Sequence, residues 1–250
     1  MTVDYQRWGG STPLRALRSI NLTLETGQCF GLVGESGSGK TTLARVIVAL
    51  QIPTSGSVQY DGIDPFLSES SERRRFRQEV AMVFQDPQSS LNPRQRIGET
   101  VVEPLVVHRR ISRRERIRKA ESLLERVGLG AGLSDRFPHE LSGGQRQRVG
   151  IARAISLCPR LLVMDEPVSA LDVSVQAQIL NLLLDLKTEM GITYLFIAHN
   201  LAVVRSFCDS VGVMKCGELV ETAPTDRLFS RPRHPYTQTL LASVLGVRVG

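Results

Sequence analysis

The stretch CFGLVGESGSGKTT (residues 29–42) decides the fold of this 250-residue chain. Cys29–Val33 predicts a short buried strand, and GESGSGKT (34–41) fits the pattern G-x-x-x-x-G-K-[ST]. A helical run begins near Thr41. A glycine-rich turn that matched by chance would lack this strand and helix. The stretch therefore predicts a loop that binds the phosphates of a nucleoside triphosphate, as nucleoside triphosphatases and kinases have.

The residue types in this loop suit an anion. Its glycines free the backbone to curl around a phosphate and turn N–H groups inward, and the helix start adds partial positive charge. Lys40 is expected to reach the β- and γ-phosphates, and the Thr41 hydroxyl to coordinate Mg²⁺. The ATP-binding candidates here are Gly34, Glu35, Ser36, Gly37, Ser38, Gly39, Lys40, Thr41 and Thr42.

A second apolar strand, in LLVMDEP (161–167), ends in two adjacent carboxylates. The expected second half of such a site is a strand that ends in a carboxylate able to hold Mg²⁺. Asp165 is the candidate for this role, through a water molecule, and Glu166 is placed to polarise the water that attacks the γ-phosphate. Two adjacent carboxylates favour hydrolysis over kinase chemistry, because a kinase must keep water out.

Strand and helix patterns alternate along the rest of the chain. Apolar runs bounded by turn residues predict strands at 21–24, 29–33, 57–60, 80–84, 161–165, 194–198 and 211–215. Helical periodicity covers 41–50, 112–127, 145–157 and 173–190. Strands with helices between them predict an α/β fold with a mainly parallel sheet.

Residues 87–149 contain no run that resembles a buried strand and are rich in Arg, Gln, Ser and Pro. We interpret this region as a helical subdomain inserted into a core formed by 1–86 and 150–225, with a helical tail at 226–250. The whole chain, 1–250, is then a single nucleotide-binding domain.

The pentapeptide LSGGQ (141–145) predicts a second anion-binding surface. Ser142 is a good helix N-cap, and Gly143 and Gly144 expose backbone N–H groups at the start of that helix. Taken alone, the pentapeptide could be a mere helix cap. Its place after the phosphate loop and shortly before the acidic strand favours a functional role.

In this order and spacing, the motifs resemble those of the ATP-binding-cassette family over nearly the whole chain. They correspond to its Walker A loop (34–42), glutamine loop (Gln85 in FQDPQSSLNPR, 84–94), signature motif (141–145), Walker B strand (161–167), D-loop (169–172) and switch histidine (His199). The resemblance implies a P-loop NTPase core of the RecA-like kind, with a mainly parallel sheet, an antiparallel β edge and an inserted α-helical subdomain.

The resemblance also implies the roles of the remaining residues. Two cassettes pack head to tail, so that each ATP lies between the phosphate loop of one and the signature of the other. The contacts to the partner's ATP then come from Ser142, Gly143, Gly144 and Gln145, and Asp172 steadies the partner's site. The catalytic candidates are Glu166, His199 and Gln85, and the Mg²⁺ candidates are Thr41, Gln85 and Asp165.

Two further positions are the residue after the switch histidine and the aromatic side chain at the adenine. Many family members have Asp after the switch histidine, whereas this chain has Asn200. For the aromatic side chain that stacks on adenine, Trp8 fits best and Tyr5 is the alternative. An aromatic residue this near the N-terminus could also serve only in packing.

FQDPQSSLNPR (84–94) and RPRHPYTQTLLASVL (231–245) resemble the branch that serves oligopeptide, dipeptide and nickel importers. This branch implies a second ATPase subunit, either a paralogue or a copy of this chain. It also implies two transmembrane permease subunits and, indirectly, an extracytoplasmic substrate-binding protein. The cargo stays open between peptides and nickel or metal chelates. Some members carry a cysteine-clustered extension for an iron–sulfur cluster. This chain ends without one, so no such cluster is expected.

Composition predicts a protein that stays in the cytoplasm, and the resemblance implies a peripheral position at the cytoplasmic face of the cell (inner) membrane. It has 42% apolar and 22% charged residues, and no apolar run reaches the roughly 18–20 residues of a membrane-spanning helix. The N-terminus lacks the features of a secretory signal, and the four cysteines form no CxxC pair. Much of the net charge of +6 comes from HRRISRRERIRKA (108–120), which we interpret as a solvated helix face.

Three other classes share parts of this pattern. A DNA-associated ATPase of the same head type would need coiled coils or zinc modules, and neither heptads nor CxxC pairs occur, so no nucleic-acid partner is expected. LSGGQ and the pair Asp165 and Glu166 argue against a kinase or a GTPase. The complete motif set argues against an inert regulatory cassette.

Overall fold

The computed structural model describes residues 1–5, 13–86, 90–109 and 111–245. The chain divides into two compact units. The first unit contains Met1–Phe76 and Thr193–Gly250, and the second contains Arg77–Ile192. Helix α2 (Ser70–Glu79) crosses the boundary between them in the sequence.

The first unit is built on a mainly parallel sheet. Its central strand β3 (Cys29–Val33) pairs in parallel with β6 (Thr193–Ile197) and with β7 (Ser210–Lys215). Strand β8 (Glu218–Pro224) pairs with β7 in the antiparallel sense. Every residue of β3 and β6 is buried, which agrees with the continuous apolar runs that parallel strands need.

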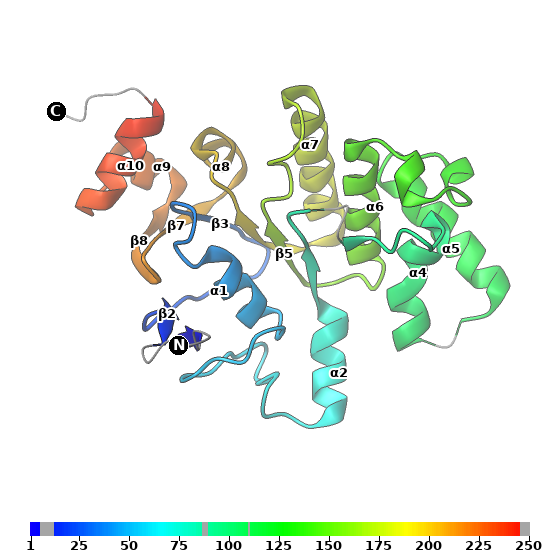
Figure 1. Cartoon of the computed structure of the whole chain (residues 1–250), viewed down its shortest axis with the longest axis horizontal. Helices are drawn as coiled ribbons and strands as arrows, with labels where there is room; N and C mark the ends of the chain where they lie inside the picture. Colours follow the sequence, from blue (N-terminus) through cyan, green and yellow to red (C-terminus); the bar gives the residue numbers. More distant parts are fainter. Residues whose placement is uncertain (6–12, 87–89, 110, 246–250) are drawn as a thin grey trace. The chain divides into compact units, whose positions relative to one another are not determined.

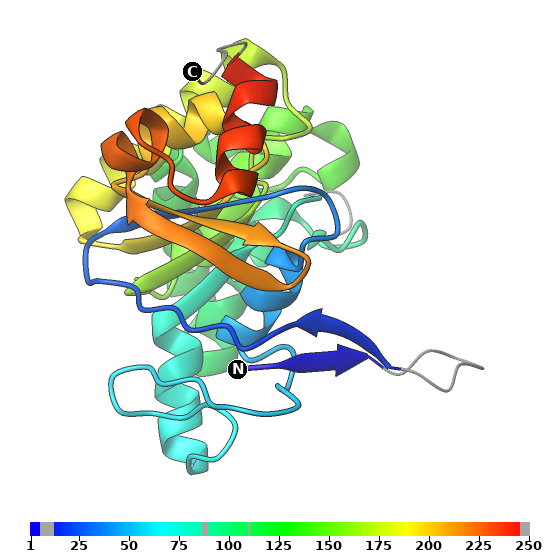
Figure 2. The same ribbon diagram turned by 90° about the vertical axis from the view of Figure 1, so that its left-hand side faces the viewer.

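Besides most of α2, the described part of the first unit contains helices that follow its strands in the sequence (Figure 1). Helix α1 (Lys40–Ile47) follows β3, and α8 (Leu201–Phe207) lies between β6 and β7 in the sequence. Helices α9 (Thr225–Ser230) and α10 (Pro235–Leu245) follow β8. Figure 2 shows these last two helices, in orange and red, beside the β7–β8 hairpin. The chain therefore returns to its own sheet at its C-terminal end.

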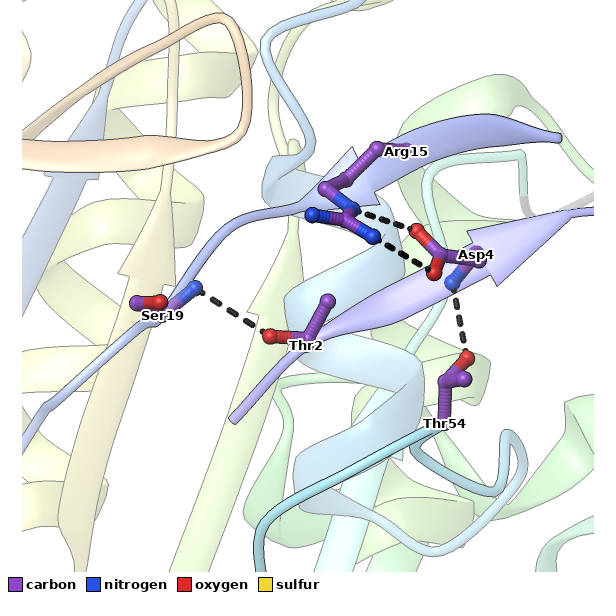
Figure 3. A network of polar contacts seen from close by, with 5 residues as sticks. All are labelled: Thr2, Asp4, Arg15, Ser19 and Thr54. Atoms are coloured by element: carbon purple, nitrogen blue, oxygen red, sulfur yellow. Dashed lines mark hydrogen bonds and ion pairs between the residues drawn. The ribbon is translucent and has the colours of Figure 1, made fainter. Parts of the chain in front are cut away.

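A second, antiparallel pair of strands in this unit consists of β1 (Val3–Tyr5) and β2 (Leu14–Leu17). Its polar contacts are drawn in Figure 3. The guanidinium of Arg15 binds both carboxylate oxygens of Asp4, at 2.8 and 3.2 Å, and lowers the pKa of that carboxyl. The N–H of Asp4 donates to the Thr54 hydroxyl at 2.9 Å. The bonds from Arg15 join the two strands, and the bond to Thr54 holds the pair to the chain that follows α1.

The second unit combines a parallel strand pair with a group of helices. Strand β4 (Val80–Val83) pairs in parallel with β5 (Leu161–Asp165). Helices α4 (Ile97–His108), α5 (Arg113–Arg126) and α6 (Gly143–Ile155) pack together, and Val101, Leu124 and Val149 on them are fully buried. Two 3₁₀ turns, Ala131–Leu133 and Pro138–Glu140, lie between α5 and α6 in the sequence, and α7 (Val173–Met190) follows β5.

The predicted α/β fold with a mainly parallel sheet is confirmed, and so are five of the seven predicted strands. The predictions at 21–24 and 57–60 are wrong, because those backbones form no ladder within the described residues. Alternating or apolar residues alone do not make a strand without a hydrogen-bonding neighbour. Within the basic segment, residues 112–119 are exposed and all but the N-cap Ser112 lie on α5, which agrees with the predicted solvated helix face. Among the described residues, no helix is both long and apolar enough to cross a membrane.

Candidate functional site

The loop between β3 and α1 has the geometry of an anion cradle. Gly34, Gly37 and Gly39 all have positive φ, at 152°, 77° and 105°. A Cβ atom on Gly34 would lie 2.2 Å from the backbone oxygen of Met214, and one on Gly39 would lie 2.7 Å from that of Ala16. A Cβ on Gly37 would meet no described atom within 4 Å. Glycine is therefore required by close packing at the two ends of the loop, whereas the middle faces open space.

Lys40 is folded back across this loop. Its Nζ donates to the backbone oxygens of Gly34 and Glu35, at 2.8 and 2.9 Å, and lies 3.5 Å from the Ser38 hydroxyl. Only 6% of Lys40 is exposed. At the start of α1, Gly39 is the N-cap, and no side chain of the described residues caps the helix there. A buried ammonium and a helix start without a side-chain cap together suit a bound phosphate.

Two contacts from the C-terminal part of the chain brace the loop, and the sequence analysis missed both. The N–H of Gly217, in the turn between β7 and β8, donates to the backbone oxygen of Ser38 at 2.9 Å. The hydroxyl of Tyr236, on α10, accepts a hydrogen bond from the N–H of Glu35 at 3.3 Å. The sequence contains turn residues at 216–217 and the tail motif, but neither pattern predicts a contact with the phosphate loop.

His199 lies at the same edge of the sheet as the phosphate loop. It follows the carboxyl end of β6, where the N–H of Ala198 donates to the backbone oxygen of Leu32 at the carboxyl end of β3. The next residue, Asn200, is the N-cap of α8, and its Oδ1 accepts from the N–H groups of Ala202 and Val203. Asn and Asp are equally good N-caps, so Asn200 meets the local need that Asp would meet.

In the second unit, Gln85 and Glu166 meet side by side. They follow the carboxyl ends of the paired strands β4 and β5, and Gln85 Nε2 donates to Glu166 Oε2 at 2.9 Å. Asp165, the last residue of β5, is only 3% exposed. Glu166 itself has φ 48°, a left-handed conformation that costs a non-glycine residue about 1–2 kcal/mol. The strained backbone and the amide partner both fix the position of this carboxylate.

The signature pentapeptide forms the start of α6. The Ser142 hydroxyl accepts from the N–H of Gln145 at 3.3 Å, and Gln145 Oε1 accepts from the N–H of Ser142 at 2.9 Å, which is a capping box. A Cβ on Gly144 would lie 2.6 Å from Val175 Cγ1 on α7, so the glycine permits close contact between the two helix starts. The Ser142 hydroxyl proton can still be donated to an outside oxygen.

Asp172 caps the neighbouring helix start. Its Oδ1 accepts from the N–H of Val175 at 3.0 Å and from the Ser174 hydroxyl at 2.7 Å. These two bonds, the backbone bond first, lower the pKa of Asp172. Gln176 holds the turn before it through bonds from its Nε2 to the backbone oxygens of Val168 and Leu171. The aspartate therefore has a clear role within its own chain.

Of the two candidates for stacking on adenine, the structure describes Tyr5. Trp8 lies outside the described residues. Tyr5, the alternative, is the last residue of β1 and is half-buried.

The site defines a P-loop nucleotide-binding protein. It consists of strand β3, a glycine loop with a buried lysine, and a helix that starts without a side-chain cap. A family model described as "ABC transporter" matches residues 17–169, and one described as "Oligopeptide/dipeptide transporter, C-terminal region" matches 220–249. The chain belongs to the ABC transporter family. The first model spans the phosphate loop, Gln85, the signature and the acidic strand, and the second includes Tyr236.

Curated relatives are similar over nearly the whole chain. The di/tripeptide transport ATP-binding protein DppF of Pseudomonas aeruginosa is 48% identical over 94% of this chain and 72% of its own length. The oligopeptide transport ATP-binding protein AppF of Bacillus subtilis is 49% identical over 92% and 70%. Among solved structures, the dimeric ATP-binding cassette MJ0796, bound to ADP and Pi after hydrolysis, has a TM-score of 0.81 and 32% identity, covering 90% of this chain and 96% of that chain.

Proposed function

We propose that this chain is the ATP-hydrolysing subunit of an importer for oligopeptides or dipeptides. The observation that carries the proposal is the phosphate loop, with Lys40 buried inside it and Gly37 open beside it. The names of the relatives, DppF and AppF among them, support peptides as the cargo, and so does the match of the tail at 220–249. Nickel and metal chelates are the alternative cargoes that a transport assay separates from peptides.

The residues present fit ATP and Mg²⁺. The loop 34–42 offers backbone N–H groups, the Lys40 ammonium and the Thr41 and Thr42 hydroxyls to phosphate oxygens. Thr41, Gln85 and Asp165 offer oxygen ligands, which Mg²⁺ prefers. When bound, Mg-ATP supplies the phosphoanhydride bond that water cleaves to give ADP and phosphate.

The catalytic roles follow from the groups at hand. Glu166 would take a proton from the attacking water, since it is the carboxylate that Gln85 holds in place. His199 would donate to the γ-phosphate from the end of β6. Lys40 would balance the phosphate charge, because its ammonium is already fixed in the loop.

The signature residues Ser142, Gly143, Gly144 and Gln145 are proposed to bind the nucleotide of a partner cassette, and Asp172 to steady that partner's site. The dimeric form of the solved neighbour supports this assembly. ATP bridging two cassettes favours the closed pair over the open pair, and hydrolysis removes that preference. The partner is a paralogue or a second copy of this chain.

The assembly further includes two permease subunits in the membrane and, indirectly, an extracytoplasmic substrate-binding protein. This chain would lie at the cytoplasmic face of the membrane. The proposed helical subdomain, 87–149, would transmit opening and closing to the permeases. Residues 1–86 and 150–225 would form the nucleotide-binding core, and 226–250 the tail.

The test is transport by the assembled complex. The chain is co-purified with its neighbouring subunits, placed in proteoliposomes with the binding protein, and given labelled dipeptide, oligopeptide or nickel. ATP-dependent uptake of peptide, lost in Lys40→Ala, is expected. ATP turnover without peptide uptake, or uptake of nickel alone, would contradict peptide as the cargo. No turnover in the complete complex would contradict the ATPase role.

A further inference from the structure

The start of the C-terminal tail is tied firmly to the sheet of the first unit. The two carboxylate oxygens of Glu221, on β8, accept from the N–H groups of Arg233 and His234 at 2.8 and 2.9 Å. Pro235 then begins α10, a position that suits its fixed φ. The N–H of Tyr236 donates to His234 Nδ1 at 3.2 Å. The backbone is thus held on both sides of Pro235, just before the side chain of Tyr236.

The Tyr236 ring is held as well. It is only 8% exposed, and Lys215 Nζ lies 4.7 Å from the ring centroid. A cation over an aromatic face attracts it and restricts its motion. The hydroxyl of this fixed ring is the group that reaches the phosphate loop, where it accepts from the N–H of Glu35.

The residue that Tyr236 contacts is also one that holds the loop lysine. The backbone oxygen of Glu35 accepts from Lys40 Nζ at 2.9 Å and from the N–H of Ser38 at 3.2 Å. Tyr236 therefore holds the N–H of the residue whose carbonyl holds the Lys40 ammonium. A shift of the Glu35 backbone would move one acceptor of the charge that meets the phosphates.

The Tyr236 hydroxyl keeps one protonation state over the physiological pH range. Burial raises the pKa of its phenol, the hydrogen bond from Glu35 N–H offsets only part of the rise, and the Glu35 carboxyl group adds to it. The group is therefore neutral at physiological pH and accepts the hydrogen bond throughout that range.

We propose that Tyr236 is a positioning residue of the nucleotide site, through which the C-terminal tail sets the conformation of the phosphate loop. The inference rests on the proposed function, because it assigns the tail a part in holding the same nucleotide. It gives the tail region matched at 220–249 a task within the cassette itself.

The test compares Tyr236→Phe with Tyr194→Phe in the full chain. The first change keeps the ring and removes the hydroxyl at the loop. The second removes a buried phenol at the amino end of β6, where Tyr194 pairs with Cys29, away from the carboxyl edge that carries the loop. Calorimetry with Mg-ATP gives Kd, turnover in the assembled complex gives KM and kcat, and hydrogen exchange of the nucleotide-free chain follows the Glu35 amide.

In Tyr236→Phe we expect Kd and KM for ATP to rise about two- to tenfold, the effect of one lost hydrogen bond, with kcat within about twofold of wild type. The Glu35 amide should exchange faster. In Tyr194→Phe, Kd and the exchange of Glu35 should stay as in wild type, even if the melting temperature falls. Unchanged Kd and exchange in Tyr236→Phe would overturn the role of Tyr236. A wild-type chain without affinity for Mg-ATP would overturn the proposed function, and this role with it.

Discussion

Two glycine-rich stretches of this chain each lead into a helix, yet they are built differently. In the phosphate loop the glycines have left-handed backbone, the helix start has no side-chain cap, and Lys40 lies inside. In the signature, Gly143 and Gly144 are the first residues of α6, and the helix start is already capped by Ser142. The first is a complete anion cradle, whereas the second has N–H donors and a hydroxyl but no cation of its own in the pentapeptide.

The difference indicates how the two stretches share the binding of a triphosphate. A complete cradle can hold a triphosphate by itself, because it supplies charge, N–H donors and shape. An incomplete one can only add donors to an anion that another cradle holds. We therefore expect ATP-dependent dimerisation to pair the phosphate loop of one cassette with the signature of the other, and variants can change one stretch without the other.

The largest effect is expected from Glu166→Gln, which leaves both glycine stretches intact. Removing the carboxylate that Gln85 holds should lower ATP turnover by about 10²–10⁴, the usual contribution of a general base. ATP binding should persist, and the cassettes should stay joined in Mg-ATP. Size-exclusion chromatography with the partner subunit present checks this. Only monomer under those conditions would count against the assignment.

Lys40→Ala is aimed at the complete cradle alone. Losing a charged hydrogen bond costs about 1.5–3 kcal/mol, so nucleotide affinity should fall about 10-fold to 150-fold. The matched control is Lys119→Ala, on the exposed face of α5, which should bind ATP normally. Calorimetry measures both. Equal affinities for the two variants would contradict the cradle assignment.

Adding one methyl group to each stretch should change the free energy of unfolding differently. Gly34→Ala places a Cβ against the Met214 backbone oxygen and at positive φ, so the free energy of unfolding should fall by about 2 kcal/mol or more. Gly143→Ala meets only Leu171 Cδ2, at 3.6 Å, and Ala favours the helix, so stability should stay or rise by up to about 1 kcal/mol. Urea unfolding measures the stability of both variants, and equal losses of stability would refute the difference between the two stretches.

The smallest effect on the isolated chain is expected from Ser142→Ala. Loss of the cap should lower stability by about 0.5–2 kcal/mol and leave nucleotide binding by the single chain unchanged. Ser112→Ala is the control, because it removes a matching capping box on α5. Both should cost similar stability, but only Ser142→Ala should weaken the ATP-dependent dimer. If the two variants dimerise equally, Ser142 is a cap and nothing more.

The sequence was most informative where chemistry is local. GESGSGKT (34–41) predicts its own geometry, since each glycine and Lys40 act within a few residues of one another. Similarly, the apolar run 161–164 predicts a strand that ends at Asp165, and β5 ends there. The predictions of strands at 21–24 and 57–60 were wrong, because a strand needs a hydrogen-bonding neighbour and a local sequence pattern does not reveal one.

Long-range contacts were out of reach for the same reason. No local signal links Tyr236 to Glu35, which are 201 residues apart in the sequence, and no local signal links Gly217 to Ser38. The helix start at Asn200 is the opposite case: a departure from the usual aspartate looked uncertain in the sequence, and the structure shows a satisfied N-cap.

The central claim is tested most directly by a structure of the Glu166→Gln chain with its partner cassette and Mg-ATP. The account predicts each triphosphate in the phosphate loop of one cassette, with the hydroxyl of Ser142 and the N–H of Gly144 from this chain on the γ-phosphate in the other. Nucleotide bound at the loop with both signature residues distant from any phosphate would contradict it.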